Sequence, residues 1–404
     1  MPTFEQYFLM NTDNVIQYVK SKIDSFQSAQ QITCKEIGDG NLNYVYRVFN
    51  TETNESVIVK QAGTTARISD EFVLSTSRNK IETEGLKLQH ILAPGLVPEI
   101  YLLDEIMSCC IMEDLSKLTI MRTALTNFET FPHFAEHITD FLVNTLLGTS
   151  DVVLNHKEKK ELVRTFINPE LCEISEDLVF TEPFHNNFNR NEVTPGNEQF
   201  VQTLLYSNEE LHLEVAKLKF HFMNNTQSLV HGDLHTGSIF IDHNDTKVID
   251  PEFAFFGPMG YDIGNIMANL IFAWTRGRAY EHKEFTEWVE NTLFDIMDLF
   301  ETKFRAAWDE HATEVVAKNA DFKEHYIQNI LKDTAGMAGL ELARRIVGLA
   351  KVKDITTIEP IENRLKAERL CLRVAVELIL NPLEFQTGGQ YIAALQNAQQ
   401  EENQ

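Results

Sequence analysis

The pattern of apolar positions predicts a helix followed by a strand-rich segment. Residues 13–26 repeat apolar side chains at helical spacing, and Asp13 stands where it can cap the helix. The runs CKEIGDGNLNYVYRVFN and ESVIVKQAG are rich in β-branched and aromatic residues and flank TETNE, which is typical of a hairpin. A helical run over about 77–92 and two apolar strands, EIYLLDE and SCCIMEDL, follow. Residues 30–116 are therefore predicted to be strand-rich with one helix.

Beyond Leu118 the pattern becomes mainly helical. One clear strand pair remains, SIFIDH and TKVIDPEF, on either side of an Asn-Asp turn. The stretch HNNFNRNEVTPGNEQF is predicted to be a polar loop, and the tail AQQEENQ is expected to be frayed. The helical runs, each with apolar residues at a period of 3.6, cover 133–148, 158–166, 209–224, 283–309 and 322–349. A small β-rich part followed by a larger helical part predicts an α+β fold.

The composition is that of a soluble globular protein, with 43% hydrophobic and 24% charged residues in a chain of 404. The 35 Lys and Arg residues are outnumbered by 60 Asp and Glu residues, which gives a net charge of −25. Because such a surface repels phosphate backbones and anionic lipids, we expect neither nucleic acid nor a membrane surface as a partner. A polyanionic ligand would have to be held by a few placed cations and metal ions.

The five cysteines predict neither a disulfide framework nor a metal site, because their number is odd and no two form a CxxC pair. They fit a reducing, cytoplasmic setting. The first twenty residues lack the basic and apolar segments of a signal peptide. The most apolar later stretch, MGYDIGNIMANLIFAW, is interrupted by Asp262, Asn265 and Asn269, and we do not expect it to span a membrane.

The most informative stretch is VHGDLHTGSIFIDHNDTKVIDPEFAFFGPMGYDIG, residues 230–264. Asp233 is predicted to lie in a loop, and Asp250 to lie at the end of a short strand. Transfer of a phosphoryl group to an alcohol needs one carboxylate that orients the attacking hydroxyl and accepts its proton. It also needs carboxylates that hold Mg²⁺ against the nucleotide phosphates. Asp233 and Asp250 can supply both functions.

His231 and His235 flank Asp233 and raise the alternative of a zinc pair. The glycine between them and the loop context do not suit the helix that an HExxH-type pair requires. We therefore expect the two histidines to hold the loop, and Asp262 to accept backbone N–H groups from it.

HGDLHTGSI and IDPEFAFFGPMGYDIG resemble the catalytic and metal-binding signatures of the 5-methylthioribose kinases, which are relatives of choline and aminoglycoside kinases. EIGDGNLNYVYRV, the strand with Lys60, MEDL, NPELC and ELARRIVGLA extend the similarity over about residues 34–350. The resemblance implies a bilobal protein-kinase-like fold, with a nucleotide-binding lobe over 1–116 and a helical lobe with the catalytic loop and substrate site over 117–404. It further implies ATP and Mg²⁺ as cofactors and a homodimer. The implied reaction phosphorylates the anomeric hydroxyl of 5-methylthioribose to the 1-phosphate, in methionine salvage.

By this resemblance Asp233 is the catalytic base and contacts the sugar, whereas Asp250, Pro251 and Glu252 contact the nucleotide and its metal, with Asp250 and Glu252 as the Mg²⁺ ligands. One position departs from the wider kinase pattern, which places an Asn five residues after the catalytic Asp as a second metal ligand. Ser238 occupies this position and is a poorer ligand for a hard cation. Glu252, two residues after Asp250 on a predicted strand, would share its face and replace the missing amide.

In the first lobe Lys60 lies in an apolar strand and needs a partner for its charge, unless it is only a solubilising residue of an edge strand. An ATP phosphate can supply one partner, and an acidic residue of the next helix can supply another. We expect Glu82, with Glu84 as the alternative. Gly38 and Gly40 would let backbone N–H groups approach phosphates, although the same residues could form a hairpin turn.

The resemblance adds further nucleotide contacts that no side-chain pattern shows. It implies that Asn43 contacts ATP. It also implies that Glu113, Asp114 and Leu115 form the hinge whose backbone groups bind adenine.

Arg344 and Arg345 lie in an apolar helical pattern, where neighbouring side chains point about 100° apart. One interpretation is an ion pair within or between helices. The other, which the resemblance favours, is that the pair binds the sugar and the arriving phosphate, for which a guanidinium fork is suited. Because of the angle we expect at most one of them to point fully into the site, and we favour Arg344.

Two other functions remain open. A kinase of choline, an amino alcohol or an aminoglycoside would keep the fold, but a cationic substrate would require an acidic or aromatic pocket rather than an arginine pair. A pseudokinase would keep the fold without turnover, and the joint presence of Lys60, Asp233, Asp250 and Glu252 argues against it. ATP turnover with and without methylthioribose separates the three.

Overall fold

The computed structural model describes residues 4–37, 43–63 and 78–402. The chain forms two compact units: unit 1 comprises Met1–Leu118 and Lys247–Phe253, and unit 2 comprises Thr119–Thr246 and Ala254–Gln404. Strands dominate unit 1 and helices dominate unit 2, so the predicted α+β fold with a small β-rich first part and a larger helical second part is confirmed. The short segment that carries Asp250 and Glu252 belongs to unit 1, although it comes late in the chain.

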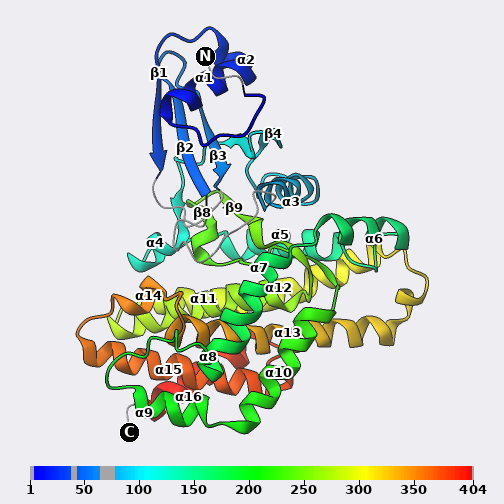
Figure 1. Cartoon of the computed structure of the whole chain (residues 1–404). Coiled ribbons are helices and arrows are strands. Elements are labelled where there is room, and N and C mark those ends of the chain that lie inside the picture. The colour runs from blue at the N-terminus through cyan, green and yellow to red at the C-terminus, as the bar shows by residue number, and fades with distance from the viewer. Residues whose placement is uncertain (1–3, 38–42, 64–77, 403–404) are drawn as a thin grey trace. The chain divides into compact units, whose positions relative to one another are not determined.

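Unit 1 is built on a five-stranded antiparallel sheet (Figure 1). Its strands are β1 (Ile32–Ile37), β2 (Asn43–Asn50), β3 (Ser56–Ala62), β4 (Ile100–Asp104) and β5 (Cys109–Glu113), in the order β1-β2-β3-β5-β4. Its helices are α1 (Thr12–Lys22), α2 (Asp24–Gln27), α3 (Arg78–Leu92) and the 3₁₀ helix η4 (Pro251–Phe253). The register pairs Lys60 with Val45 on one side and with Cys110 on the other, so Lys60 lies in the central strand and not at an edge.

The predicted hairpin is confirmed as β2 and β3, and its turn has a local cause. Asn54 adopts a φ of 62°, which asparagine tolerates better than most side chains. The turn closes with a hydrogen bond from the backbone N–H of Asn50 to the carbonyl of Glu55 over 2.8 Å. The hairpin positions Asn43 at the start of β2 opposite Ala62 at the end of β3.

The core of unit 1 lies between helix α1 and the sheet. Val15 and Val19 of α1 are fully buried and belong to one hydrophobic cluster with Val48 of β2 and Val59 of β3. Each such side chain contributes roughly 1.5–3 kcal/mol when it leaves water. This packing holds the central strands, and with them Lys60, in a fixed register.

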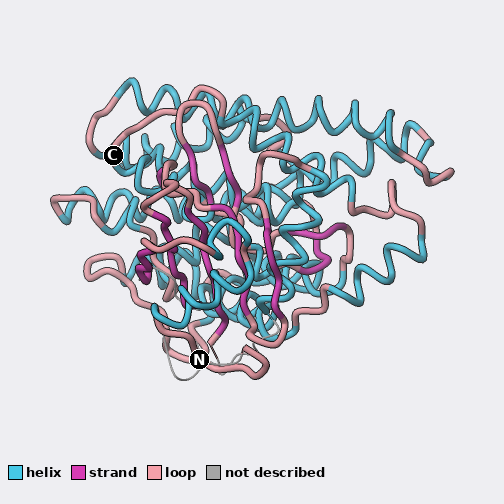
Figure 2. The backbone as a smooth tube through the Cα atoms, turned by 90° about the horizontal axis from the view of Figure 1, so that it is seen from above, coloured by secondary structure: helices cyan, strands magenta, loops and turns pink. Residues whose placement is uncertain are grey.

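Unit 2 is mainly helical, as the cyan segments of Figure 2 illustrate. The helices that the sequence pattern predicted are present as α5 (Phe134–Gly148), α6 (His156–Thr165), α10 (Glu209–Asn224), α12 (Lys283–His311) and α13 (Ala320–Val347). Those that the pattern did not predict are α4 (Met121–Thr126), α7 (Pro169–Ser175), α8 (Glu182–His185), α9 (Glu198–Val201), α11 (Gly260–Ala279), α14 (Lys353–Thr356), α15 (Ile361–Leu380) and α16 (Gly388–Glu402).

Short strands and tight helical turns complete the second part of the chain. The strands are β6 (Thr119–Ile120), β7 (Ser228–Val230), β8 (Ile239–Ile241), β9 (Thr246–Val248) and β10 (Phe255–Gly257). Two π-helical segments, η1 (Glu176–Thr181) and η2 (Gln202–Tyr206), and three 3₁₀ turns, η3 (Thr236–Ser238), η5 (Val316–Lys318) and η6 (Pro382–Glu384), lie between the α-helices. The predicted fraying of the tail is wrong for its described residues, because α16 continues to Glu402 and this carboxylate accepts hydrogen bonds from Arg369 and Arg373 of α15.

Helices α11 and α13 pack against each other at backbone distance. A Cβ atom added at Gly260 would lie 2.6 Å from the backbone nitrogen of Thr334, and one added at Gly264 would lie 2.7 Å from that of Ala338. Only glycine fits such an approach. The contact fixes α13, which carries Arg344, relative to the start of α11.

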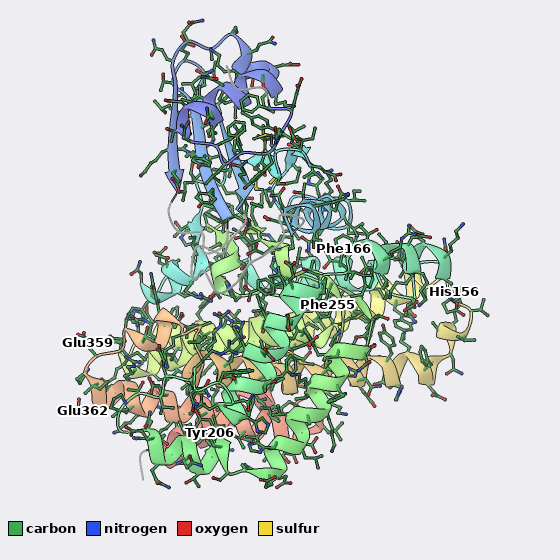
Figure 3. The ribbon with its side chains drawn as sticks, viewed as in Figure 1. His156, Phe166, Tyr206, Phe255, Glu359 and Glu362 are labelled. Carbon is green, nitrogen blue, oxygen red and sulfur yellow. The ribbon has the colours of Figure 1, made fainter. Side chains whose placement is uncertain are left out.

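Side chains fill the spaces between the helices of unit 2 in Figure 3. Phe166, labelled there, is 3% exposed and meets the ring of Phe256 edge to face, with 6.4 Å between the ring centroids. Within the described ranges, we find no helix with the length and the apolar character needed to cross a membrane.

Candidate active site

Apart from the predicted hinge at Glu113–Leu115, most of the predicted site residues fall into two clusters, one in each unit. The first, which we call the lysine cluster, consists of Lys60, Asn43, Glu82, Asp250 and Glu252 of unit 1. The second, which we call the aspartate cluster, consists of Asp233, His235, Glu341, Arg344 and Arg345 of unit 2.

Lys60 forms the centre of the lysine cluster. Its ammonium nitrogen lies 2.7 Å from Oε1 of Glu82 in helix α3 and also forms an ion pair with Oδ1 of Asp250. The expected pairing with Glu82 is confirmed, whereas Glu84 pairs with Lys87 at the surface, over 3.0 Å. A lysine that is buried in a central strand and contacts carboxylates from two other segments has a specific role beyond solubility.

The segment with Asp250 and Glu252 is a turn and not a strand, so the argument that the two residues share one face of a strand is wrong. Asp250 has a φ of 63°, and the residues Pro251–Phe253 form the 3₁₀ helix η4. The left-handed residue redirects the chain after β9, and the side chain of Asp250 then reaches Lys60. Oε2 of Glu252 accepts a hydrogen bond from the Asn43 amide over 3.0 Å.

The electrostatics of the lysine cluster leave an excess of negative charge. Burial disfavours the charged form of Lys60, but Asp250, Glu82 and Glu252 outweigh it and hold the Lys60 pKa well above its ordinary value. Burial, reinforced by Asp250 and Glu252 and opposed by Lys60, raises the pKa of Glu82 to about 8. Asp250 and Glu252 contribute to both shifts, beside the burial that is the largest cause for Glu82, so the cluster favours further positive charge.

The lysine cluster offers negative charge and oxygen ligands, which are what Mg²⁺ requires of a protein site. Mg²⁺ prefers oxygen ligands and is commonly held by one or two carboxylates together with phosphates and waters. Asp250 and Glu252 supply carboxylates, and the buried Oδ1 of Asn43 and Oε2 of Glu82 have no hydrogen-bond partner among the residues that the structure describes. No group of three or more His, Cys, Asp or Glu side chains within those residues could hold a metal ion alone. The residues present therefore fit a cation that shares its ligands with a nucleotide.

The predicted hinge lies at the end of β5. The Asp114 carboxylate accepts a hydrogen bond from Nε of Arg47 over 2.6 Å and one from the Ser116 backbone over 2.9 Å, and Glu113 pairs with Lys247 over 3.4 Å. These side chains are engaged within unit 1, so any contact to a base would come from backbone groups. Gly38 and Gly40, predicted to approach phosphates, lie outside the described residues.

The aspartate cluster is organised by the loop that follows β7. The backbone N–H groups of His231 and Gly232 donate to the two carboxylate oxygens of Asp262 over 2.6 and 3.0 Å, which confirms the expected role of Asp262. Gly232 has a φ of 84°, a conformation that glycine adopts without strain. Asp233 follows at once, and its own N–H donates to Nδ1 of His231 over 3.3 Å.

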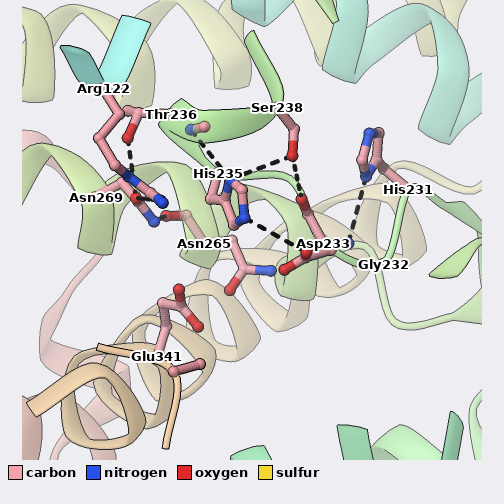
Figure 4. A network of polar contacts seen from close by, with 12 residues as sticks. Arg122, His231, Gly232, Asp233, His235, Thr236, Ser238, Asn265, Asn269 and Glu341 are labelled. Carbon is pink, nitrogen blue, oxygen red and sulfur yellow. Dashed lines mark hydrogen bonds and ion pairs between the residues drawn. The ribbon is translucent and has the colours of Figure 1, made fainter. Parts of the chain in front are cut away.

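One face of α11 supports this loop. Asp262 and Asn269 are two of the three polar residues that interrupt the apolar stretch at this position of the sequence. Oδ1 of Asn269 accepts hydrogen bonds from Thr236 in the loop and from Arg122 of α4, each over 3.1 Å (Figure 4). Two of the three polar breaks in the apolar pattern, Asp262 and Asn269, therefore hold the loop that contains Asp233.

Asp233 is surrounded by cationic and hydrogen-bonding groups. Nε2 of His235 lies 3.4 Å from its Oδ2 (Figure 4), and Nη2 of Arg344 and Nη2 of Arg345 lie 3.4 and 3.6 Å from its Oδ1. Burial alone would raise the pKa of Asp233, but His235, Arg345 and Arg344 outweigh it and hold the pKa well below the ordinary range. The carboxylate stays charged and can accept a hydrogen bond from a substrate hydroxyl.

Both arginines reach Asp233, so the expectation that at most one would point into the site is wrong. The cause is Glu341, which lies one turn earlier on α13 and forms ion pairs with Nε of Arg344 and, over 2.8 Å, with Nε of Arg345. Residues three and four positions later on a helix both lie beside the first one. Glu341 draws the two forks together, and despite its burial they lower its pKa to about 2.

Sequence reasoning missed Glu341 and Arg122. The spacing of Glu341 to the arginine pair was a usable signal, because three and four residues is the distance of side-chain pairs on one helix face. No local pattern pointed to Arg122, since its neighbours in space come from other helices. A Cβ at Gly237 would lie 3.0 Å from Nη1 of Arg122 and 2.9 Å from Cε1 of His235, so the guanidinium lies against the catalytic loop.

Comparisons with known proteins identify the chain's relatives. The phosphotransferase enzyme family matches residues 33–287. The methylthioribose kinase of Geobacillus sp. (strain WCH70) is 41% identical over 361 residues, which cover 89% of this chain and 88% of the relative. That of Bacillus cereus (strain G9842) is 40% identical over 374 residues, covering 92% of this chain and 93% of the relative.

Solved structures with a similar course of the chain include a choline kinase from Cryptosporidium parvum, at 13% identity with a TM-score of 0.49, covering 97% of this chain and 96% of that one. Another is a glucosamine kinase in complex with glucosamine, ADP and inorganic phosphate, at 12% identity with a TM-score of 0.46, covering 89% and 85%.

Proposed function

The chain belongs to the phosphotransferase enzyme family and, within it, to the methylthioribose kinases, and from this membership we propose that it transfers the terminal phosphoryl group of ATP to methylthioribose. The acceptor atom is the anomeric hydroxyl and the product is the 1-phosphate. The reaction serves methionine salvage. Two independent lines support the proposal: the identity of about 40% to methylthioribose kinases over most of both chains, and the chemistry of the two clusters.

The lysine cluster is the nucleotide side of the reaction. Lys60 binds the phosphates of ATP, and Asn43 and Pro251 line the same site. The backbone of Glu113, Asp114 and Leu115 binds adenine. Asp250 and Glu252 hold Mg²⁺, which when bound neutralises charge on the transferred phosphoryl group. The excess of carboxyl groups around Lys60 supports this assignment, because carboxylate oxygens are the ligands that Mg²⁺ prefers and a divalent ion offsets their charge.

The aspartate cluster is the acceptor side. Asp233 orients the sugar hydroxyl and takes its proton as the new bond to phosphorus forms. A loose transition state for phosphoryl transfer needs little basicity, so a carboxylate with a lowered pKa suffices as long as it is well placed. Arg344 and Arg345 donate to the sugar and to the phosphoryl group as it arrives.

We choose a neutral sugar as the acceptor because both arginine forks approach the same oxygen of Asp233. Guanidinium groups donate to hydroxyl and phosphate oxygens and repel ammonium groups. This arrangement supports a neutral sugar as substrate and disfavours choline, amino alcohols and aminoglycosides.

The test is a coupled assay of ADP release with methylthioribose, ribose, choline and an aminoglycoside as acceptors, with and without Mg²⁺. We expect turnover with methylthioribose and Mg²⁺ at least 100-fold above that with the cationic acceptors, and a phosphorylated anomeric carbon in the product by ³¹P and ¹³C NMR. Equal turnover of choline, or phosphorylation at another carbon, would refute the proposal.

We further propose that the protein works as a homodimer in the cytoplasm. The sequence resemblance supports the dimer, and light scattering of the purified chain tests it against the monomer mass of 46.4 kDa. All five cysteines lie in the described part of the chain as free thiols, three of them buried, which supports a reducing compartment.

A further inference from the structure

His235 is a candidate for a role that neither the sequence motif nor the proposed reaction assigns. It lies two residues after Asp233, and both of its ring nitrogens face polar groups of the catalytic loop. The ring is largely buried, with 15% of the side chain exposed. The groups around it come from three elements: Asp233 and Ser238 from the loop, Arg122 from α4 and Arg345 from α13.

The protonation state of the ring follows from its hydrogen bonds. The backbone N–H of Gly237 donates to Nδ1 over 3.0 Å. A backbone N–H can only donate, so Nδ1 must carry a lone pair and the proton of the neutral ring must be on Nε2. The Ser238 hydroxyl lies 3.2 Å from the same Nδ1 and 3.1 Å from the carbonyl of Asp233, to which it donates its one proton, so the Gly237 N–H is the group that fixes the tautomer. Nε2–H then faces Oδ2 of Asp233 at 3.4 Å.

The cations nearby keep the ring neutral. Burial, together with Arg122 and Arg345, lowers the pKa of His235, although Asp233 opposes this shift. An imidazolium would place a second N–H against the Gly237 N–H and break the turn η3. The neutral ring therefore satisfies both the loop and the carboxylate.

We propose that His235 is a positioning residue, whose neutral Nε2–H tautomer holds Oδ2 of Asp233 and leaves Oδ1 for the acceptor hydroxyl and the arginines. The two carboxylate oxygens of Asp233 have different neighbours: His235 approaches Oδ2, and Arg344 and Arg345 both approach Oδ1. Without His235 the carboxylate could rotate, and each rotation would offer the acceptor a wrongly aimed lone pair. This inference rests on the proposed function, because it assigns Asp233 to the acceptor.

Two substitutions separate positioning from loop support. His235→Asn retains a side-chain oxygen near the position of Nδ1, which can accept from Gly237, but it cannot reach Asp233. His235→Gln places an amide N–H near the position of Nε2, where it can donate to Asp233. We expect His235→Asn to lower kcat by roughly 10- to 100-fold, the loss typical of one hydrogen bond to a charged group, and His235→Gln to restore most of it. The KM for ATP should change less than twofold in both.

His221→Asn is the matched control. Nε2 of His221 lies 2.7 Å from Oδ2 of Asp333, so this variant removes another His–Asp contact in the same unit, away from the loop. We expect its kcat to equal that of the wild type. If His235→Asn keeps wild-type kcat, or if His235→Gln is the weaker of the two, His235 supports only the loop and the inference is wrong.

A spectroscopic measurement keeps the inference testable should a variant fail to fold. In the wild type, ¹⁵N NMR of the labelled imidazole should show a protonated Nε2 and an unprotonated Nδ1 between pH 6 and 8. A proton on Nδ1, or a charged ring, would overturn the inference whatever the substrate. If the wild type does not phosphorylate methylthioribose at all, the proposed function fails instead, and the NMR result still decides the tautomer.

Discussion

Glu341 and Arg345 lie one helical turn apart on α13, and the carboxylate of Glu341 accepts a hydrogen bond from Nε of Arg345 over 2.8 Å. The same carboxylate pairs with Nε of Arg344 through its other oxygen. Both guanidinium groups thus use their inner nitrogen for Glu341 and turn an outer nitrogen toward Asp233. A carboxylate buried between two arginines in this way holds both guanidinium groups beside Asp233.

Replacing Glu341 by Gln should damage both stability and acceptor binding. The variant leaves two buried guanidinium groups without their shared counter-charge, which we expect to cost roughly 3 kcal/mol of unfolding free energy. The KM for methylthioribose should rise at least tenfold, with the KM for ATP little changed. Denaturant melts and steady-state kinetics measure the two effects.

Glu301→Gln is the matched control, because Glu301 pairs with Arg305 at the same four-residue spacing, over 2.7 Å, on α12, where both side chains are partly exposed. Exposed pairs of this kind contribute only about 0.5 kcal/mol. If the two variants behave alike, the special role of Glu341 is disproved.

Because of Glu341, the free energy of unfolding should decrease at acidic pH. Its pKa of about 2 in the folded chain lies below its ordinary value of 4.5. A lowered carboxylate pKa means that the folded state binds the proton less readily than the unfolded state, so the stabilisation is complete above pH 4.5 and is lost as the pH falls toward 2. The stability difference between the wild type and Glu341→Gln should therefore shrink over this window. A constant difference in denaturant melts at pH 7, 5, 4 and 3 would contradict it.

The sequence predicted those parts of the site that depend on neighbours along the chain. Lys60 and Glu82 were paired correctly because a strand followed by a helix brings them together. The turn at Asp250 could not be predicted, because its positive φ results from contacts of the folded chain and an Asp in TKVIDPEF fits a strand equally well. The angle between their Cα–Cβ bonds predicts that the side chains of Arg344 and Arg345 point in different directions. Both side chains are long enough to bend toward Glu341, so their guanidinium groups lie close together.

Substitution of Glu252 should change the Mg²⁺ concentration that the reaction requires, whereas substitution of Ser238 should not. Glu252→Gln removes a carboxylate from the lysine cluster, and we expect the Mg²⁺ concentration for half-maximal rate to rise at least tenfold. Ser238→Ala should leave that concentration unchanged, because the Ser238 hydroxyl donates to the carbonyl of Asp233 over 3.1 Å and serves the loop. Initial rates against free Mg²⁺ at saturating ATP decide the matter. An unchanged profile for Glu252→Gln would exclude Glu252 as a metal ligand.

Asp233→Asn should abolish turnover and leave ATP binding nearly intact, because Asp233 belongs to the acceptor side. Loss of a general base costs about 10²- to 10⁴-fold in rate. The kcat is measured by ADP release, and the affinity for ATP by calorimetry without acceptor. A variant that keeps more than a tenth of the wild-type kcat would show that Asp233 is not the base.

Arg344→Lys and Arg345→Lys should impair acceptor use to a similar degree, since both forks contact Glu341 and approach the same oxygen of Asp233 at 3.4 and 3.6 Å. Lysine keeps the charge but carries all its N–H donors on one nitrogen, so it loses the planar fork that directs one nitrogen to Glu341 and another toward Asp233. Each variant should lower kcat/KM for methylthioribose by roughly 1–3 kcal/mol, the range of a hydrogen bond to a charged group, with the KM for ATP little changed.

The double variant tests whether the two arginines act as one unit. Two groups that share the same two counter-ions, Glu341 and Asp233, are expected to be non-additive, so the double substitution should cost less than the sum of the single ones. Arg305→Lys, at a partly exposed Glu–Arg pair of α12, provides the control and should leave kcat/KM unchanged. Kinetics with each substrate varied in turn, together with a melting curve for every variant, separate binding from stability. If only one of the two arginines affects methylthioribose, Glu341 does not align the pair, and the other arginine belongs to the packing of α13 alone.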